Sequence, residues 1–299
     1  MTVVEVSHVN KTFGPIKAVD DVSFNVEEAE IFGLLGPNGA GKTTIIRLML
    51  GIFEPQGGSV SILGGVMNED KKNQIGYMPE ERGLYQDVLL ERVLVYLAML
   101  KGLPRKEAHR RVALYLERFD LWTYRNKRVK ELSKGMQQKA QIIATLVHQP
   151  RLVVVDEPFS GLDPVNTQMV KDLLLELRAD GTTIIMSTHQ MHQVEELCDR
   201  ILLINRGRVV LYGDLDQIRR QFAGNAVLVQ ANVELPVLPG VDHIESVNGI
   251  SRLVLSPEIN QQQVLHALVE LGIPLEKFEV AMPTLSEIFI RVVQDNWSG

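Results

Sequence analysis

The chain is poor in the features that would set it apart from an ordinary globular protein. Its 299 residues include one cysteine, Cys198, so an intrachain disulfide is excluded and metal-ligand spacing is missing. We therefore expect a reducing compartment. There is no run of about 18 apolar residues, and the N-terminus lacks the basic and apolar regions of a secretory signal. Any membrane role is then expected to come through a partner chain.

An excess of positive charge is also absent. The chain carries 31 Lys and Arg against 37 Asp and Glu, for a net charge of -6. Proteins that bind nucleic acid usually present a basic field, so this balance argues against a nucleic-acid partner. Apolar residues make up 45% and charged residues 23% of the chain, which indicates a globular protein with a substantial core. The length allows one large domain and one small one.

Periodicity divides the chain into regions. Strand-like and turn-like stretches alternate over the first 75 or so residues, which predicts a β-rich beginning. Apolar residues then recur at helical spacing, and a second helix starts near Pro104, so about 81–135 is predicted to be a helical subdomain. Beyond it, strands alternate with helices, as in a parallel sheet with crossover helices. The predicted class for 1–212 is therefore α/β.

The pattern changes again near the C-terminus. Residues 213–224 include the basic helix "QIRRQF" and are predicted to form a linker helix. Short strand-like and helical stretches alternate over 225–299, which we interpret as a small accessory domain of the α+β class.

The stretch "GPNGAGKTT" at 36–44 is the most informative segment of the chain. It fits G-x-x-x-x-G-K-[ST] and lies between the predicted strand "EIFGLLG" and a predicted helix, which is the context that a phosphate-binding loop requires. The glycines allow backbone N–H groups to turn inward around an anion, and the helix N-terminus points toward it. Lys42 is expected to reach the β- and γ-phosphates, and Thr43 to bind Mg²⁺.

Two carboxylates follow a second buried strand, in "LVVVDEP". Open α/β sheets bind ligands at the C-terminal ends of their strands, where Asp156 and Glu157 would lie. We expect Asp156 to hold Mg²⁺ and Glu157 to orient or deprotonate the attacking water. A strand that ends in an acidic turn is the plain alternative, and the phosphate loop favours the catalytic interpretation.

A second anion-binding surface is predicted in "ELSKGMQQKAQIIATLV". Ser133 is a good helix N-cap, and with Gly135 it presents a hydroxyl, exposed N–H groups and a helix dipole. A chain with one complete phosphate loop does not need this surface for its own nucleotide. The surface makes sense if it closes over the nucleotide of another subunit.

Together, these motifs resemble the nucleotide-binding subunits of ABC transporters. The order "GPNGAGKTT", "LSKGMQQK", "LVVVDEP", "SGLD" and "STH" carries the resemblance over about 1–212. It implies a P-loop NTPase core of the ABC ATPase type, with "LSKGM" as the signature motif and Asp156 and Glu157 as the Walker B pair. The implied Walker A residues are Gly36, Pro37, Asn38, Gly39, Ala40, Gly41, Lys42, Thr43 and Thr44.

Three further residues take roles from the same resemblance. Asp163 of "SGLD" is implied to lie in the D-loop at a subunit interface. His189 is implied to be the switch histidine that contacts the γ-phosphate, and Phe13 to be the aromatic residue that stacks on adenine. The plain alternatives are a core or rim position for Phe13 and a satisfied polar side chain for His189.

The chain departs from the family pattern at three positions. Lys134 and Met136 stand where the signature normally has glycine and glutamine, while Ser133 and Gly135 are kept. Glu80 stands where the family has a glutamine that touches Mg²⁺ or water and reports nucleotide state to the membrane partner, and a carboxylate could still do either. The plain alternative is a solvated acidic loop. The loop "PEERGLY" and the C-terminal module are similar to the drug-export and sodium-export branch of ABC-2-type systems.

The resemblance implies an ATP-driven export motor with ATP and Mg²⁺ as cofactors. Two copies, expected as a homodimer, would close head to tail on the cytoplasmic face of the membrane, beside a separately encoded permease. Three rivals stay open from the sequence: a soluble ABC ATPase of translation or repair, a module that uses ATP only as a switch, and an importer. The substrate is not readable from this chain.

Overall fold

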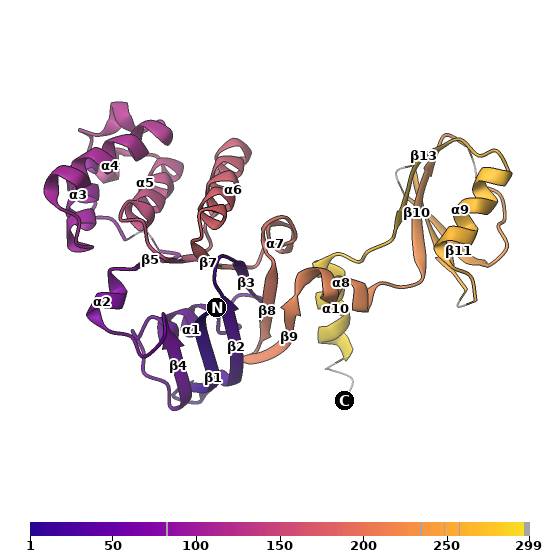
Figure 1. Cartoon of the computed structure of the whole chain (residues 1–299), viewed down its shortest axis with the longest axis horizontal. Helices are drawn as coiled ribbons and strands as arrows, with labels where there is room; N and C mark the ends of the chain where they lie inside the picture. Colours follow the sequence, from indigo (N-terminus) through magenta and orange to yellow (C-terminus); the bar gives the residue numbers. More distant parts are fainter. Residues whose placement is uncertain (82, 234, 248, 257, 296–299) are drawn as a thin grey trace. The chain divides into compact units, whose positions relative to one another are not determined.

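The chain folds into two compact units, Met1–Asp214 and Leu215–Gly299, which are described separately (Figure 1). The computed structural model describes residues 1–81, 83–233, 235–247, 249–256 and 258–295. Arg82 of the loop "PEERGLY" therefore lies outside the described residues. Within the described ranges, no helix combines the length and the apolar composition needed to cross a bilayer.

The first unit is centred on a six-stranded sheet in the order β5-β6-β7-β3-β8-β9. Its strands are β3 (Ile31–Leu35), β5 (Ile75–Met78), β6 (Leu152–Asp156), β7 (Thr183–Thr188), β8 (Arg200–Asn205) and β9 (Arg208–Asp214). The first five strands in that order pair in parallel, and β9 pairs antiparallel to β8. Every residue of β3, β6 and β7 is buried, as expected for strands covered on both faces.

The register of this sheet places the predicted site residues together. Asp156, at the end of β6, pairs with Ser187 of β7, and Leu35, at the end of β3, pairs with Thr188. Because parallel strands end at the same edge, the loops after β3, β6 and β7 converge there.

A second, antiparallel sheet in the order β2-β1-β4 forms the β-rich N-terminal part. Its strands are β1 (Thr2–Phe13), β2 (Ile16–Glu27) and β4 (Gly57–Ile62). The helix α1 (Lys42–Met49) contacts all three strands of this sheet. One apolar core joins this sheet, α1 and the central sheet, and the rings of Phe24 and Phe32 stack within it with centroids 5.5 Å apart.

Helices make up the rest of the first unit. They are α2 (Glu69–Lys72), α3 (Leu90–Leu100), α4 (Arg105–Arg118), α5 (Lys134–Leu146), α6 (Pro164–Ala179) and α7 (Met191–Leu197), with short 3-10 turns at Trp122–Tyr124 and Val129–Glu131. The helices α3, α4 and α5 contact one another (Figure 1). The helical subdomain predicted over about 81–135 includes α3 and α4, whereas most of α5 lies beyond it. The start predicted near Pro104 is confirmed, because Pro104 is the N-cap residue of α4.

The second unit has its own sheet and core. It begins with α8 (Leu215–Phe222), and its sheet has the order β11-β12-β10-β13. The elements are β10 (Ala226–Ala231), β11 (Val241–Val247), β12 (Ile250–Leu255), α9 (Gln261–Glu270), β13 (Leu275–Val280) and α10 (Leu285–Asp295). Residues from β10, β12 and α9 form a separate apolar cluster. The predicted α+β class is confirmed, although β11 was not expected.

Candidate nucleotide site

The loop at 36–44 joins β3 to α1, and its glycines are required by both conformation and space. Gly36 has φ 152° and Gly41 has φ 113°, within the region that disfavours side chains. A Cβ on Gly36 would lie 2.3 Å from the Ile204 carbonyl oxygen, and one on Gly41 would lie 2.4 Å from that of Ala18. Gly41 caps α1 without a side chain, so the first N–H groups of the helix are available to a ligand.

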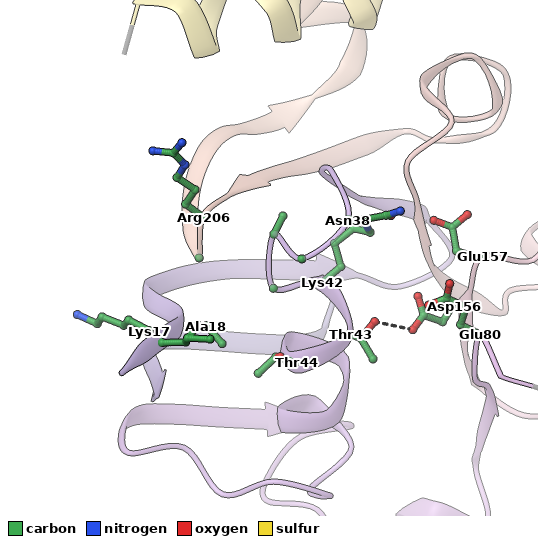
Figure 2. A pocket seen from close by; sticks show the side chains of 15 residues that line it. Lys17, Ala18, Asn38, Lys42, Thr43, Thr44, Glu80, Asp156, Glu157 and Arg206 are labelled. Atoms are coloured by element: carbon green, nitrogen blue, oxygen red, sulfur yellow. Dashed lines mark hydrogen bonds between the residues drawn. The ribbon is translucent and has the colours of Figure 1, made fainter. Parts of the chain in front are cut away.

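A cavity of about 540 Å³ opens beside this loop (Figure 2). The loop forms one wall, and the carboxylates of Glu80, Asp156 and Glu157 gather on one side. The residues that line it are Ile16, Lys17, Ala18, Asn38, Gly39, Ala40, Gly41, Lys42, Thr43, Thr44, Glu80, Asp156, Glu157, Arg206 and Gly207. An anion-binding loop and a group of carboxylates therefore share one cavity.

Lys42 is the buried cation of the site. Its side chain is 7% exposed, and Nζ donates to the carbonyl oxygens of Gly36 at 2.8 Å and Pro37 at 3.3 Å. Burial lowers the pKa of Lys42, and the charges of Glu157, Asp156 and Glu80 oppose that shift. The ammonium group thus lies in the loop with backbone oxygens as its partners.

Thr43 and Asp156 form a pair suited to Mg²⁺. The Thr43 hydroxyl donates to Asp156 Oδ2 at 3.0 Å, and the Ser187 hydroxyl donates to Oδ1. Asp156 is 1% exposed. Mg²⁺ is commonly held by one or two carboxylates together with substrate phosphates. The described ranges contain no cluster of three or more acidic, histidine or cysteine ligands.

Glu157 is fixed by the last residue of β7 and the first residue after it. It accepts hydrogen bonds from Thr188 Oγ1 at 3.1 Å, from the His189 backbone N–H at 3.0 Å and from His189 Nδ1 at 2.7 Å. The backbone of Glu157 is left-handed, with φ 52°. A carboxylate held by several donors keeps one orientation, as a general base must. The structure therefore brings Glu157 and His189 together.

Two hairpin turns that the sequence did not single out also line the cavity. Ile16, Lys17 and Ala18 lie at the start of β2, and Arg206 and Gly207 connect β8 to β9. The Gly207 N–H donates to the Ala40 carbonyl at 2.9 Å, which ties one turn to the phosphate loop. The dipeptide Arg206-Gly207 between two strand patterns is typical of a turn. Its contact with the loop at 36–44 could not be predicted, because the two segments are far apart in the sequence.

Phe13 is not among the residues that line the cavity. Its ring packs edge-on against Phe53, with centroids 5.4 Å apart, and it is 42% exposed. The expected contact between Phe13 and adenine stays a prediction.

Ser133, Gly135 and Asp163 do not line the cavity either. Ser133 caps α5 by accepting from the Met136 N–H at 3.2 Å, and Asp163 caps α6 by accepting from the Asn166 N–H at 2.9 Å. Hydrogen bonds from Asn166 lower the pKa of Asp163, so its carboxylate is held in the charged form. A Cβ on Gly135 would lie 3.6 Å from the Gly161 carbonyl oxygen, so "LSKGM" and "SGLD" are neighbours.

The phosphate loop follows one parallel strand, β3, and an acidic pair stands at the end of another, β6, which defines a P-loop nucleotide-binding protein. Comparison with known families refines this class. Residues 19–160 match the family described as "ABC transporter", and residues 213–293 match "ATP-binding protein DrrA1-3-like, C-terminal domain". The chain belongs to the family of ABC transporter ATP-binding proteins.

Individual relatives agree with this placement. The chain is 41% identical over 292 residues to the uncharacterized ABC transporter ATP-binding protein YhaQ of Bacillus subtilis. The matched region covers 96% of this chain and 97% of the relative. It is 31% identical over 310 residues to the daunorubicin resistance ATP-binding protein DrrA3 of Streptomyces coeruleorubidus, with 99% and 97% coverage. A solved structure of an ATP-binding subunit of an ABC transporter aligns at TM-score 0.69 and 36% identity, covering 74% of this chain and 93% of that one.

These similarities confirm the predicted family and fold. They also decide against the soluble translation or repair ATPase, because transporter ATP-binding proteins align with nearly the whole chain. The chain is therefore an ATP-binding and ATP-hydrolysing subunit of a transporter.

Proposed function

We propose that this chain is the ATP-driven motor of an export system and acts through a separately encoded membrane permease. The observation that carries the proposal is the single cavity that Lys42, Thr43, Asp156 and Glu157 share. The export direction is supported by the similarity to a daunorubicin resistance protein and by the matching C-terminal domain. Acting through a permease, the subunit would lie on the cytoplasmic face of the membrane.

The arrangement of the cavity supports a proposed role for each of its main residues. Loop N–H groups and Lys42 would bind the β- and γ-phosphates, and Thr43 and Asp156 would hold Mg²⁺. When bound, Mg²⁺ neutralises charge on the phosphate oxygens. Glu157 would orient and deprotonate the attacking water, while His189, which binds the Glu157 carboxylate, would contact the γ-phosphate.

A second copy of the chain would complete each site. Ser133, Gly135 and Asp163 are grouped at the N-termini of α5 and α6, outside the chain's own cavity. The Ser133 hydroxyl accepts from Met136 and can still donate its own proton. A head-to-tail homodimer would place this donor and the Gly135 N–H against the partner's γ-phosphate.

Glu157→Gln tests the hydrolytic part of this proposal. The amide cannot accept the proton of water, so we expect ATP hydrolysis to fall by roughly 100-fold or more, while ATP binding is kept and an ATP-bound dimer accumulates. Steady-state hydrolysis and light scattering with MgATP measure both effects. Glu117→Gln, on the exposed side of α4, is the matched control and should hydrolyse ATP normally. A Glu157→Gln protein that stays monomeric with ATP would contradict the dimer.

The transport part is tested by purifying a tagged copy from detergent-solubilised native membranes and identifying the co-purifying proteins by mass spectrometry. A multi-spanning membrane protein in stoichiometric amount is the expected result. Recovery without any membrane protein would leave the ATP chemistry intact and overturn the separate permease.

A further inference from the structure

A buried glutamine on α5 contacts the loop that carries Glu80. Gln141 is 4% exposed, and its Nε2 donates to the carbonyl oxygens of Pro79 at 2.8 Å and Glu81 at 3.3 Å. These two carbonyls flank Glu80 in the sequence. Both amide protons of one side chain therefore hold the backbone on either side of a residue that lines the nucleotide cavity.

Burial of the polar Gln141 side chain has a cost in folding free energy. Its neighbours along α5, Ala140, Ile142 and Ile143, are buried and apolar. Gln141 Oε1 is buried and has no hydrogen-bond partner among the described residues. A buried acceptor without a partner destabilises a fold. The side chain thus serves through its two donors, and both reach the same loop.

The position of the loop that carries Glu80 determines where one of the negative charges lies in the cavity. Glu80 lies with Asp156 and Glu157 on the same side (Figure 2). Its charge is one of the three that raise the pKa of Lys42 against the effect of burial. A shift of the Glu80 backbone would therefore change the field at the phosphate and metal end of the site.

A second glutamine, three residues earlier on α5, contacts the loop that follows Glu157. Gln138 is 5% exposed, and its Nε2 donates to the Pro158 carbonyl at 3.1 Å, next to Glu157. Residues three apart lie on one face of a helix. One face of α5 thus binds the loops of Glu80 and Glu157, and the same helix begins at Ser133.

We infer that Gln141 is a positioning residue that fixes Glu80 at the metal end of the nucleotide site and so sets how strongly Mg²⁺ promotes nucleotide binding. The inference rests on the proposed role of Asp156 and Thr43 in holding Mg²⁺. It gives Glu80, which replaces the family glutamine, a defined place and a defined support.

Gln141→Met tests the inference because it keeps the length of the side chain and removes both donors. Calorimetry with a non-hydrolysable ATP analogue, in Mg²⁺ and in EDTA, gives the ratio of the two dissociation constants. Loss of an outer support commonly weakens a metal site about 10-fold or more, so we expect this ratio to fall about 10-fold while binding in EDTA stays within about twofold. Gln141→Glu, which lacks the donors but keeps the shape, is expected to act in the same direction.

Thr145→Val is the matched control. Thr145 lies one turn further along α5, is buried, and donates to the Gln141 backbone carbonyl at 2.9 Å. The variant loses a buried hydrogen bond of the same helix without touching the Glu80 loop, so its Mg²⁺ ratio should equal that of the wild type. Thermal melting of each variant checks that it is folded.

A double-mutant cycle with Glu80→Gln tests whether Gln141 acts through Glu80 or independently of it. If Gln141 acts through Glu80, then Gln141→Met changes the ratio by less than about twofold in the Glu80→Gln background. An equal fall in both backgrounds, or an equal fall with Thr145→Val, would overturn the inference and leave the nucleotide site as proposed. If Glu80→Gln alone leaves the ratio unchanged, Glu80 has no role at the metal and the inference fails with it.

Discussion

At the scale of single residues, Lys42 shows how burial and charge compete at one atom. The low dielectric surroundings favour the neutral amine, and three carboxylates favour the ammonium. In the chain alone, the donors of Lys42 are directed to its own loop carbonyls. Phosphate oxygens are stronger acceptors than these carbonyls, so nucleotide would draw the ammonium toward them.

Lys42→Ala should therefore abolish tight ATP binding. Loss of a charge-assisted contact of up to about 3 kcal/mol corresponds to roughly 100-fold in affinity. Calorimetric titration with ATP measures the loss, and Lys106→Ala, at an exposed position of α4, serves as the control. An affinity within a few-fold of the wild type would contradict the assigned role of Lys42.

His148 gives the fold a dependence on pH. Burial, with Lys101 and Arg111 nearby, lowers the pKa of His148 from 6.5 to about 4, and Nε2 lies 3.2 Å from the Ile75 carbonyl. The unfolded chain therefore takes up this proton first as the pH falls. The contribution of neutral His148 to stability is complete above pH 6.5 and is lost as the pH falls toward 4.

We expect the wild type to lose about 2 kcal/mol of unfolding free energy between pH 7 and pH 5 through this residue. His148→Gln keeps a donor for the Ile75 carbonyl but does not titrate, so its loss over the same interval should be smaller by that amount. Urea unfolding at both pH values measures the difference. Parallel curves for the two proteins would refute the assignment.

The residues that local sequence signals singled out in two motifs lie at one cavity in the structure. The loop at 36–44 and the pair Asp156 and Glu157 were visible because the residues of each motif are contiguous. Arg206 and Gly207 were not predicted, because only the packing of distant hairpins brings them to the cavity. Gln141 was missed because a polar residue in a helix pattern is usually exposed, and only the structure shows it to be buried.

At the scale of elements, the caps of α5 and α6 connect local stability with the proposed dimer. The Ser133 side chain accepts from Met136, and the Asp163 side chain accepts from Asn166. Such a cap is worth about 1 kcal/mol. In the proposed dimer the same two residues would meet the partner's nucleotide and interface, so each side chain would serve both the helix and the assembly.

Ser133→Arg separates the two roles. It should leave ATP binding by the monomer within about twofold, because Ser133 lies outside the chain's own cavity, and it should block dimer closure and hydrolysis. Asn68→Arg removes the cap of α2, where Asn68 accepts from Lys71 at 2.9 Å, and controls for the lost cap alone. Hydrolysis at the wild-type rate in Ser133→Arg would refute the shared site.

Element prediction was accurate for buried segments and weaker at the edges. The strands β3, β6 and β7 are continuous apolar runs, as parallel strands covered on both faces are. The edge strand β11, "VDHIESV", was missed because it mixes charged and apolar residues, and among the residues that the structure describes it pairs with β12 alone. The four-residue helix α2 carries too little periodicity to predict.

At the scale of the whole molecule, each compact unit has an apolar core of its own. Ligands raise the stability of the part that binds them, by about 2.7 kcal/mol at 100 times the dissociation constant. We expect two thermal transitions by calorimetry, of which a non-hydrolysable ATP analogue with Mg²⁺ raises only the one that belongs to Met1–Asp214. The Lys42→Ala protein should show no such shift. A single transition that moves as a whole would contradict the independence of the cores.

The left-handed backbone of Glu157 has a consequence for the evolution of this chain. A residue with a Cβ pays about 1 kcal/mol or more for that conformation, and Asn or Gly tolerates it better. Thr188 and His189 hold Glu157 there through hydrogen bonds. In a gene copy selected only to bind nucleotide, substitution of Glu157 by a residue that tolerates the left-handed backbone better would be favoured. Selection for heat resistance alone would push in the same direction, so Glu157, in its proposed role as general base, would persist only while turnover itself is selected.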